Sequence, residues 1–566
     1  MWTQQYDPMG NWPLSTLLAA LPVLVLLGLL ASGRVNAWKA ALCGLLTAVT
    51  VAAGAFGMPL DLVVASAGVG IVFALFRIWQ ILAAIFLYDL AVKTGQFDVM
   101  KASIARLSAD RRLQAVLVAF VFGAFLEGAS GFGAPVAITA AFLVGLGFDP
   151  FQAALLCLIA NTAPVAWGSL AVPIRTLSAV TDLNVEVLSA TVGRILLLIP
   201  LIIPFWMIVT MVGWRATLPV WPALVVIGGS FAVVQFFWSN FVVYELVDLV
   251  SALASLGSGV VLLQFWRPKQ EWRFPHDEEE IRHVVDAQHP LTSGRVARAW
   301  TPFALLSLAV LIWCIPAVKR WMAAPHEVPG TGRVVHLEWH PTMPRLHLAI
   351  AKGEAVTGHR MPLPEDREKA VLDIVPVSAT GTGVFLAALL SGLFLGVRPA
   401  ELATTLAGTA RRMLPAYAAI LCVLALGFVT KYSGMDTVLG LAFTRTGPLL
   451  YPIFGTMIGW LGVAVTGSNT SSNVLFGNLQ KITARKLGLS EVLMTSANSA
   501  GGVMGKMIAP QSIVVAAAAT GQGGKEGDIL RTIIWHSVAL ALLVGVTVWL
   551  IAHYLSWAVV VPTGNG

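Results

Sequence analysis

The sequence has 566 residues, of which 57% are hydrophobic and only 11% charged, and its mean hydropathy is +0.80. A soluble domain carries about twice this share of charged residues and has no core able to bury so much apolar surface, so the composition excludes a soluble protein. The net charge of +7 comes from basic residues scattered among short loops without interleaved aromatic residues, which argues against a nucleic-acid partner and fits loops facing anionic lipid.

The chain contains many apolar segments long enough to cross a hydrocarbon layer about 30 Å thick, and their number predicts roughly twelve to fourteen spans. Clear examples are residues 15–32, 37–56, 188–212, 304–315 with its neighbours, and 533–557. The leading residues MWTQQYDPMGNWP lack Lys and Arg, so the first run is expected to stay as a helix. All four cysteines lie in apolar segments, where no disulfide or metal site is expected.

The first unusual run is GASGFGAP at residues 128–135, directly after Glu127. Backbone that leaves a helix inside the membrane exposes polar groups that cost several kcal/mol each unless they are satisfied. Serine satisfies such groups locally, glycine lets a ligand approach the backbone, and the free N–H groups of a broken helix attract anions. We therefore expect Ser130 and Gly131 to contact substrate, and Glu127 to carry a coupling proton.

The run NTAPVAWGSLAVP follows at residues 161–173. Asn161 and Thr162 open it, and their side chains offer the donors and acceptors that a polar substrate needs. Both residue types also cap helices, so capping stands beside substrate binding as an interpretation.

One large interruption divides the chain into a membrane half at 1–266, a polar insertion with one span at 267–375, and a second membrane half at 376–566. The stretch RVVHLEWHPTMPRLHLAIAKGE is expected to form a small surface hairpin or an irregular loop. Four of the ten histidines, His326, His336, His340 and His347, fall in this part of the insertion. Without Cys or a helix-spaced His pair, surface histidines are favoured over a metal site.

The second unusual run is GSNTSSNVLFG at residues 467–477. Its candidate substrate-binding residues are Ser468, Asn469, Thr470, Ser471 and Asn473. Apolar residues resume on both sides, which favours a polar break at membrane depth over a loop at the membrane surface.

The two halves repeat each other. The block NSAGGVMGKMIAP at 498–510 matches the block at 161–173 at four positions, each 337 residues apart: Asn161/Asn498, Ala163/Ala500, Gly168/Gly505 and Pro173/Pro510. Upstream, KTGQFD answers KYSGMD and GAFLEG answers GVAVTG, so GASGFGAP and GSNTSSNVLFG also correspond. Paired interruptions of this kind indicate a transporter site formed by discontinuous helices.

The predicted fold is therefore an all-α polytopic membrane protein with two inverted repeats, each with a re-entrant hairpin and a discontinuous helix. The segments around Ser130 and Asn469 are expected to meet near the membrane midplane. Lys506 follows Gly505 in the second block, where the first block has the neutral Ser169. One added positive charge matches one carboxylate, so Lys506, with Asn161, Asn498 and the polar tip, is expected to hold a monocarboxylate. Helix bridging or snorkelling to an interface is the alternative for Glu127 and Lys506.

These motifs resemble the bacterial lactate permease family. The resemblance rests on FLEGASGFGAPVAITAAFLVGLGF, NTAPVAWG, TGSNTSSN, GKMIAPQS and QQYDPMGNWPLS, and it runs over nearly the whole chain. It implies uptake of lactate, glycolate and related 2-hydroxy monocarboxylates with protons across a bacterial inner membrane, and a Ser-Asn-Thr tip at Ser468, Asn469 and Thr470. The stretch HEVPGTGRVVHLEWHPTMPRLHLAI departs from the family pattern, because it is more charged and richer in histidine.

Two other functions fit parts of the sequence. A sodium-coupled carrier of carboxylates would use the same Ser-Asn-Thr tip. An intramembrane serine protease would use Ser130 as nucleophile and His536 as base, but such a site needs neither two matching breaks nor a dozen spans. No cofactor and no catalytic residue are expected. The partners are the substrate anion, protons and the lipid bilayer, and homo-oligomerisation is left open.

Overall fold

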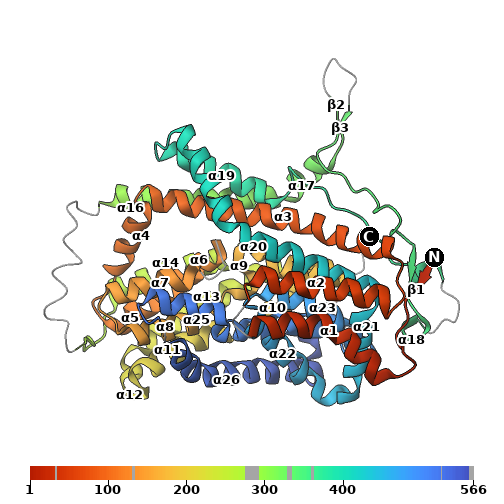
Figure 1. The fold of residues 1–566 in the computed structure, drawn as a ribbon. Helices are drawn as coiled ribbons and strands as arrows, with labels where there is room; N and C mark the ends of the chain where they lie inside the picture. The colour runs from red at the N-terminus through yellow and green to blue at the C-terminus, as the bar shows by residue number, and fades with distance from the viewer. Residues whose placement is uncertain are drawn as a thin grey trace.

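The computed structural model describes residues 1–31, 35–129, 134–274, 292–327, 334–357, 363–523 and 525–559. Helices make up most of these residues, and the long helices α3 (Leu60–Lys93) and α20 (Pro399–Ser433) pack against each other along the molecule (Figure 1). The prediction of an all-α polytopic membrane protein is confirmed.

The elements that precede the insertion follow one another in this order, with η for 3-10 and π helices. They are β1 (Trp2–Thr3), α1 (Trp12–Ala31), α2 (Ala37–Gly54), α3, α4 (Gln96–Ala105), α5 (Arg111–Ala115), η1 (Val116–Phe122), α6 (Gly123–Ala129), α7 (Ala134–Gly145), α8 (Pro150–Ala160), η2 (Val165–Trp167), α9 (Gly168–Thr181), α10 (Val185–Ile195), α11 (Ile199–Val212), α12 (Trp214–Thr217), η3 (Leu218–Val220), α13 (Trp221–Phe241), η4 (Tyr244–Leu246) and α14 (Val247–Phe265).

The remaining elements belong to the insertion and to the second membrane half. They are α16 (Ser293–Cys314), α17 (Pro316–Ala323), β2 (His326–Glu327), β3 (Val334–Val335), β4 (Ile350–Ala351), α18 (Glu354–Thr357), η5 (Pro364–Asp366), α19 (Thr380–Phe394), α20, α21 (Met435–Phe443), η6 (Thr444–Thr446), α22 (Gly447–Thr466), α23 (Asn469–Lys486), α24 (Glu491–Gly505), η7 (Lys506–Ile508), α25 (Pro510–Ala519), α26 (Glu526–His553) and η8 (Ser556–Ala558).

Among the described residues, nine helical segments are long and apolar enough to cross a membrane, or up to eleven if each of two bent pairs is one span. The expected twelve to fourteen is too high by this measure, because four further apolar helices are shorter than a full span. The apolar run expected at 188–212 is one of these two bent pairs. It is divided into α10 and α11, bent by 42°, at the turn before Pro200, which lacks the N–H group a continuous helix needs.

Several helices begin where the sequence supplies a capping side chain. Asp149, Asn184, Ser468 and Ser490 each accept a hydrogen bond from a backbone N–H in the first turn of α8, α10, α23 and α24. Such caps satisfy donors that have no partner inside the helix, and each stabilises its helix by about 1 kcal/mol.

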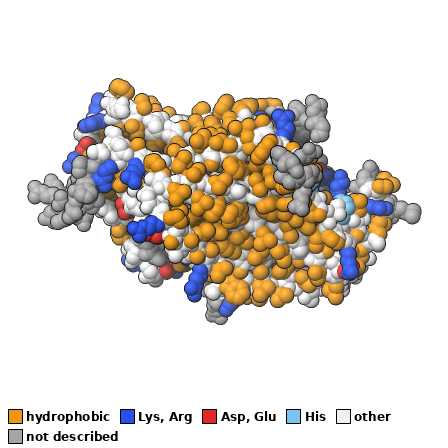
Figure 2. All heavy atoms as spheres, turned by 90° about the horizontal axis from the view of Figure 1, so that it is seen from above, with side chains coloured by type: hydrophobic (Ala, Val, Ile, Leu, Met, Phe, Trp, Pro, Cys, Tyr) orange, Lys and Arg blue, Asp and Glu red, His pale blue; other side chains and the backbone are white. Residues whose placement is uncertain are grey.

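The outer surface carries a broad hydrophobic band. Figure 2 shows this band across the middle of the molecule, while Lys and Arg side chains gather toward its two ends. Exposed leucine, valine and phenylalanine side chains on α2, α3, α13, α14 and α19 contribute to it. A surface of this kind suits contact with lipid tails between two polar interfaces.

The order of helices recurs in the two halves. α3 and α4 meet at Gly95 as α20 and α21 meet at Gly434, and both glycines have a positive φ. Helices of one half also pack against helices of the other half. In the first two pairs α2 contacts α20 and α19 contacts α3, and in two further pairs α9 contacts α23 and α7 contacts α25. Both halves therefore contribute helices to the same interfaces.

The part of the insertion after α17 lies beside one end of the bundle, and the pair of β2 and β3 extends outward from it (Figure 1). β2 and β3 form an antiparallel pair, whereas β1 pairs in parallel with β4, so the segment before α1 is tied to the insertion. Among the described residues, no group of three or more His, Cys, Asp or Glu side chains has the arrangement of a metal site.

Candidate functional site

The first broken helix bends by 65° between α8 and the segment that η2 and α9 form. The second copy of this block carries Gly501 where the first has Pro164, and a proline ends a helix in the preceding turn. After the bend, Ser169, Leu170 and Ala171 have φ values of 49°, 58° and 61°. This left-handed backbone costs about 1 to 2 kcal/mol per residue, so the break is a strained feature that its surroundings must hold in place.

Glu127 lies on α6 beside this break and is 4% exposed. Asn161, the residue that ends α8, donates a hydrogen bond from Nδ2 to Glu127 Oε2 at 2.9 Å. A Cβ atom on Gly168 would lie 2.8 Å from Glu127 Oε1, so the glycine makes room for the carboxylate. Lys506 is a further neighbour, and its positive charge attracts the negative charge of Glu127.

Lys506 lies at the second break, where α24 gives way to η7, and it is 8% exposed. Its Nζ donates to the carbonyl oxygen of Gly467 at 2.7 Å. Gly467 has a φ of 71° and ends α22, and Ser468 then caps α23. The buried lysine thus lies between the carboxylate of one half and the polar tip of the other, beside the N-terminus of α23, where free N–H groups favour an anion.

Asn473 is the centre of a second polar group. Its Nδ2 donates to the carbonyl of Pro173, a residue of α9 in the other half, at 3.1 Å, and to Ser499 Oγ at 3.3 Å. Its Oδ1 accepts from Asn498 Nδ2 at 3.0 Å. Asn469 Nδ2 also donates to Ser499 Oγ, at 3.0 Å. These contacts join α23, α24 and α9, so they couple the two halves at their breaks.

The structure brings together most, but not all, of the predicted residues. Glu127, Asn161 and Lys506 form one chain that leads to Gly467, and Asn469, Asn473 and Asn498 form the other group. Asn498 lies inside α24, so its side chain does not cap a helix.

The other predicted residues are less involved. Thr162 donates its hydroxyl to the carbonyl of Ile159 in its own chain segment, so it serves the end of α8 rather than the polar groups. Thr470 and Ser471 are half-buried in the first turn of α23. Ser130 and Gly131 lie outside the described residues.

Ser499 also belongs to the second polar group, because it accepts hydrogen bonds from the amides of both Asn469 and Asn473. Two residues in or beside the polar groups, Gln480 and Asp248, were missed by sequence reasoning. Gln480 donates to Gly455 O at 2.7 Å and accepts from Tyr451 at 2.7 Å, and its spacing of seven residues from Asn473 places both on one helix face. Asp248 lies beside α6, and its signal was an acid in the apolar run VVYELVDLV.

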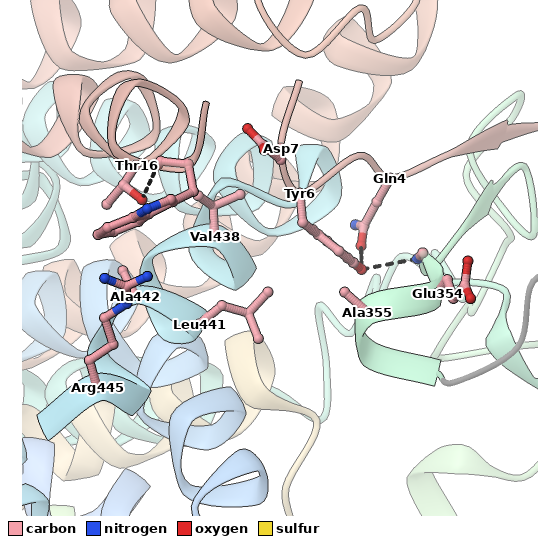
Figure 3. Close-up of a pocket in the computed structure, with 12 residues that line it drawn as sticks. Gln4, Tyr6, Asp7, Thr16, Glu354, Ala355, Val438, Leu441, Ala442 and Arg445 are labelled. Atoms are coloured by element: carbon pink, nitrogen blue, oxygen red, sulfur yellow. Dashed lines mark hydrogen bonds between the residues drawn. The ribbon is translucent and has the colours of Figure 1, made fainter. Parts of the chain in front are cut away.

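A cavity of about 690 Å³ lies away from these groups, next to the segment before α1 (Figure 3). Tyr6 and Gln4 line both this cavity and a smaller one, which Lys431, Lys481 and Asp182 also line. The Tyr6 hydroxyl donates to Gln4 Oε1 at 2.8 Å and accepts from the Gly353 N–H at 3.1 Å. Burial raises the pKa of Tyr6 to about 12, so this phenol stays protonated near neutral pH.

The fold and the site define a class of protein. Apolar spans surround two interrupted helices, the interruptions carry buried polar and charged groups, and the groups of the two halves contact each other. This is the arrangement of a multi-pass membrane transporter.

Comparison with known proteins gives the family. The family model described as L-lactate permease matches residues 15–555, and the chain belongs to that family. It is 43% identical to the glycolate permease of Escherichia coli K12, over 98% of both chains, and 41% identical to the L-lactate permease of Bacillus subtilis 168, over 99% of this chain and all of that one. A crystal structure of the YdaH transporter of Alcanivorax borkumensis aligns with a TM-score of 0.42 and 14% identity, covering 83% of this chain and 84% of that one. Membership of the family makes the protein a multi-pass transporter of the bacterial membrane.

Proposed function

We propose that this chain takes up lactate, glycolate and related 2-hydroxy monocarboxylates together with protons. The observation that carries the proposal is the position of Lys506, a buried cation held between Glu127 and the start of α23. The names of the relatives, a glycolate permease and an L-lactate permease, support the substrate class.

The carboxylate of the substrate pairs with Lys506 and with the N–H groups at the start of α23. A charged hydrogen bond contributes about 1.5 to 3 kcal/mol, and the helix end adds a smaller favourable term. Because Lys506 offers one positive charge and Glu127 already balances part of it, the site suits a monoanion better than a dianion.

The 2-hydroxyl of the substrate donates to Asn469 Oδ1. This oxygen is buried and has no hydrogen-bond partner among the described residues, although the Nδ2 of the same side chain is held by Ser499. A buried acceptor without a partner favours a ligand that supplies a donor. Asn469→Ala should therefore reduce the preference for lactate over propionate, which lacks the hydroxyl.

Glu127 links the anion to the proton. When the substrate carboxylate shares the attraction of Lys506, the charge of Glu127 loses part of its stabilisation and protonation becomes favourable. By linkage, a proton on Glu127 then strengthens anion binding to the same extent. Glu127→Gln should keep exchange of lactate between two loaded compartments but lose accumulation driven by a pH gradient.

The two halves are proposed to be inverted repeats that rock against each other around this site. α2 precedes α3 and packs on α20, while α19 precedes α20 and packs on α3. This reciprocal packing supports a two-fold relationship between the halves. A structure in a second conformation tests the inverted repeat, and these helix pairs are expected to move in it as units. Tips around residues 130 and 469 that lie far apart on one membrane face would contradict it.

Uptake of labelled lactate into proteoliposomes decides the function. A pH gradient alone should drive accumulation, a sodium gradient alone should not, and an excess of unlabelled glycolate should compete. Accumulation that follows only the sodium gradient would instead establish a sodium-coupled carboxylate carrier.

A further inference from the structure

Asp248 is a buried carboxyl group to which the proposed function gives no role. It lies in the first turn of α14 and is 1% exposed. Neither of its carboxyl oxygens has a hydrogen-bond partner among the described residues. An ionised carboxylate in such surroundings costs several kcal/mol, so the surroundings accept the protonated, uncharged form.

Asp248 lies directly beside the segment that carries Glu127. A Cβ atom on Gly128 would lie 2.8 Å from Asp248 Cβ and 3.1 Å from the backbone nitrogen of Leu249, so α6 and the start of α14 are in close contact at this point. The charges of Asp248 and Glu127 are near enough to repel each other. Two neighbouring buried carboxyl groups are not readily ionised together, and they titrate as a pair.

The two members of this pair differ in their surroundings. Glu127 has a hydrogen-bond donor in Asn161 and a favourable charge in Lys506, and both stabilise the ionised form. Asp248 has no donor among the described residues, and its charged neighbour is the like charge of Glu127. Of the two, Asp248 is therefore the group that holds a proton when no substrate is bound.

Few other ionisable groups lie on the elements packed against α14. The short helix η4 carries Glu245, which is 2% exposed. On α9, Arg175 lies over the ring of Tyr244 at 6.0 Å and donates to Thr380 Oγ1 at 3.0 Å. The neighbouring α13 and η1 have no ionisable residue in their sequences. The electrostatic state of Asp248 thus depends mainly on Glu127 and, through it, on Lys506.

We propose that Asp248 and Glu127 form the proton-binding pair of the carrier, in which Asp248 holds a proton at rest and passes it to Glu127 when a carboxylate occupies Lys506. In this step the O–H bond of Asp248 breaks and an O–H bond forms on a carboxylate oxygen of Glu127. Asp248 then takes a proton from water on the side from which the substrate came, and Glu127 gives its proton to water on the other side when the anion leaves. One proton thus accompanies each anion. This inference rests on the proposed function and specifies its coupling step.

The test uses the full chain in proteoliposomes, as wild type, as Asp248→Asn and as the matched control Glu245→Gln. Asn has the shape of a protonated Asp but no proton to give, and the control removes a second buried carboxyl group three residues away. Three quantities are measured: lactate exchange without a gradient, accumulation under a pH gradient, and lactate-driven proton entry reported by an entrapped dye.

We expect Asp248→Asn to keep lactate exchange and to lose the dye response. Its ratio of internal to external lactate under a pH gradient should be about one, as in a carrier without a driving ion. The control should resemble wild type. Accumulation by Asp248→Asn at the wild-type level would overturn the assignment, as would loss of exchange, or an equal loss of coupling in Glu245→Gln. Failure of Asp248→Asn to fold would also overturn it, since a neutral isostere should suit a site that holds a neutral side chain. If wild type itself shows no accumulation under a pH gradient, the proposed proton symport fails instead.

Discussion

The two broken helices come from the same repeated block but are built differently. In the first, Pro164 is followed by a 65° bend and by three left-handed residues. In the second, Gly501 occupies the matching position, α24 continues to Gly505, and a single turn of 3-10 helix separates it from α25. The first break places Asn161 against a carboxylate, whereas the second supplies a lysine.

The difference gives the two halves unlike charges at the breaks, an acid in the first half and a base in the second. Two identical breaks would carry two acids or two bases. Under the proposed function neither pair would suit one carboxylate that moves with one proton, whereas an acid and a base can bind one each. Variants that alter one break and spare the other should separate these tasks.

The strongest contrast is expected between Gly505→Ala and Gly168→Ala. A Cβ atom on Gly505 would lie 2.2 Å from the backbone oxygen of Trp460, so α22 and α24 would have to move apart. We expect a loss of about 3 kcal/mol in the free energy of unfolding, at the upper end of overpacking effects. On Gly168 the Cβ meets the end of the Glu127 side chain, which can shift, so about 1 kcal/mol is expected there. Thermal unfolding of both purified variants measures the difference, and equal melting temperatures would contradict it.

Lys506→Gln tests the basic side of the comparison. Loss of a charged hydrogen bond should weaken lactate binding by about 1.5 to 3 kcal/mol. Lactate-dependent thermal stabilisation of the purified protein measures this directly. Lys481→Gln is the control, because Lys481 donates to the carbonyl of Thr181 near the other end of α23 and should leave the lactate Kd unchanged. An unchanged Kd in a well-folded Lys506→Gln variant would remove the lysine from the site.

The two equivalent asparagines should respond differently to alanine. Asn498 bonds to Ser472 O, Asn473 Oδ1 and Gln480 Nε2, so its loss leaves several buried groups without partners and should reduce stability by about 2 kcal/mol. Asn161 bonds to Glu127, and its loss should cost about 1 kcal/mol while impairing proton-driven accumulation more than exchange. Loss of proton coupling only in Asn498→Ala would contradict this prediction, and it would assign the coupling to the second break instead of the first.

The weakest effect lies outside the membrane, in the insertion. The hydrogen bond from His340 Nδ1 to Asp373 Oδ1, at 2.9 Å, raises the pKa of His340 above its usual value. A raised pKa in the folded state adds stability below the ordinary histidine pKa, and this stability is lost as the pH rises through the raised value. Because the His340 side chain is 51% exposed, the effect should stay below about 1 kcal/mol.

Hydrogen exchange of the paired amides of Trp339 and Ile374 measures this effect, after correction for intrinsic rates. Protection should fall in the wild type as the pH rises above the ordinary histidine pKa, and it should change less in His340→Gln. The same pH dependence in both proteins would show that another group is responsible.

The sequence predicted the polar breaks and placed Glu127 and Lys506 in one site, because charges and glycines are expensive in apolar spans. The sequence also explains why the two broken helices bend differently, because Pro164 in the first copy of the block corresponds to Gly501 in the second. It could not reveal that Asn473 would bond to Pro173, 300 residues away, because spacing carries no information about contacts between distant helices. Asp248 stands out in the sequence as an acid in an apolar run, but the sequence could not show that it packs against Gly128 on another helix.

The parallel pairing of β1 with β4 has a consequence for biosynthesis. Trp2 pairs with Ile350, and Gln4 Nε2 donates to the carbonyls of Lys431 and Tyr432 in α20. Chains grow from the N-terminus at about 5 to 20 residues per second. The partners of these first residues are therefore synthesised some tens of seconds after the first residues themselves. The segment ahead of α1 therefore closes late in assembly, and it takes its place only after most of the membrane helices have been inserted.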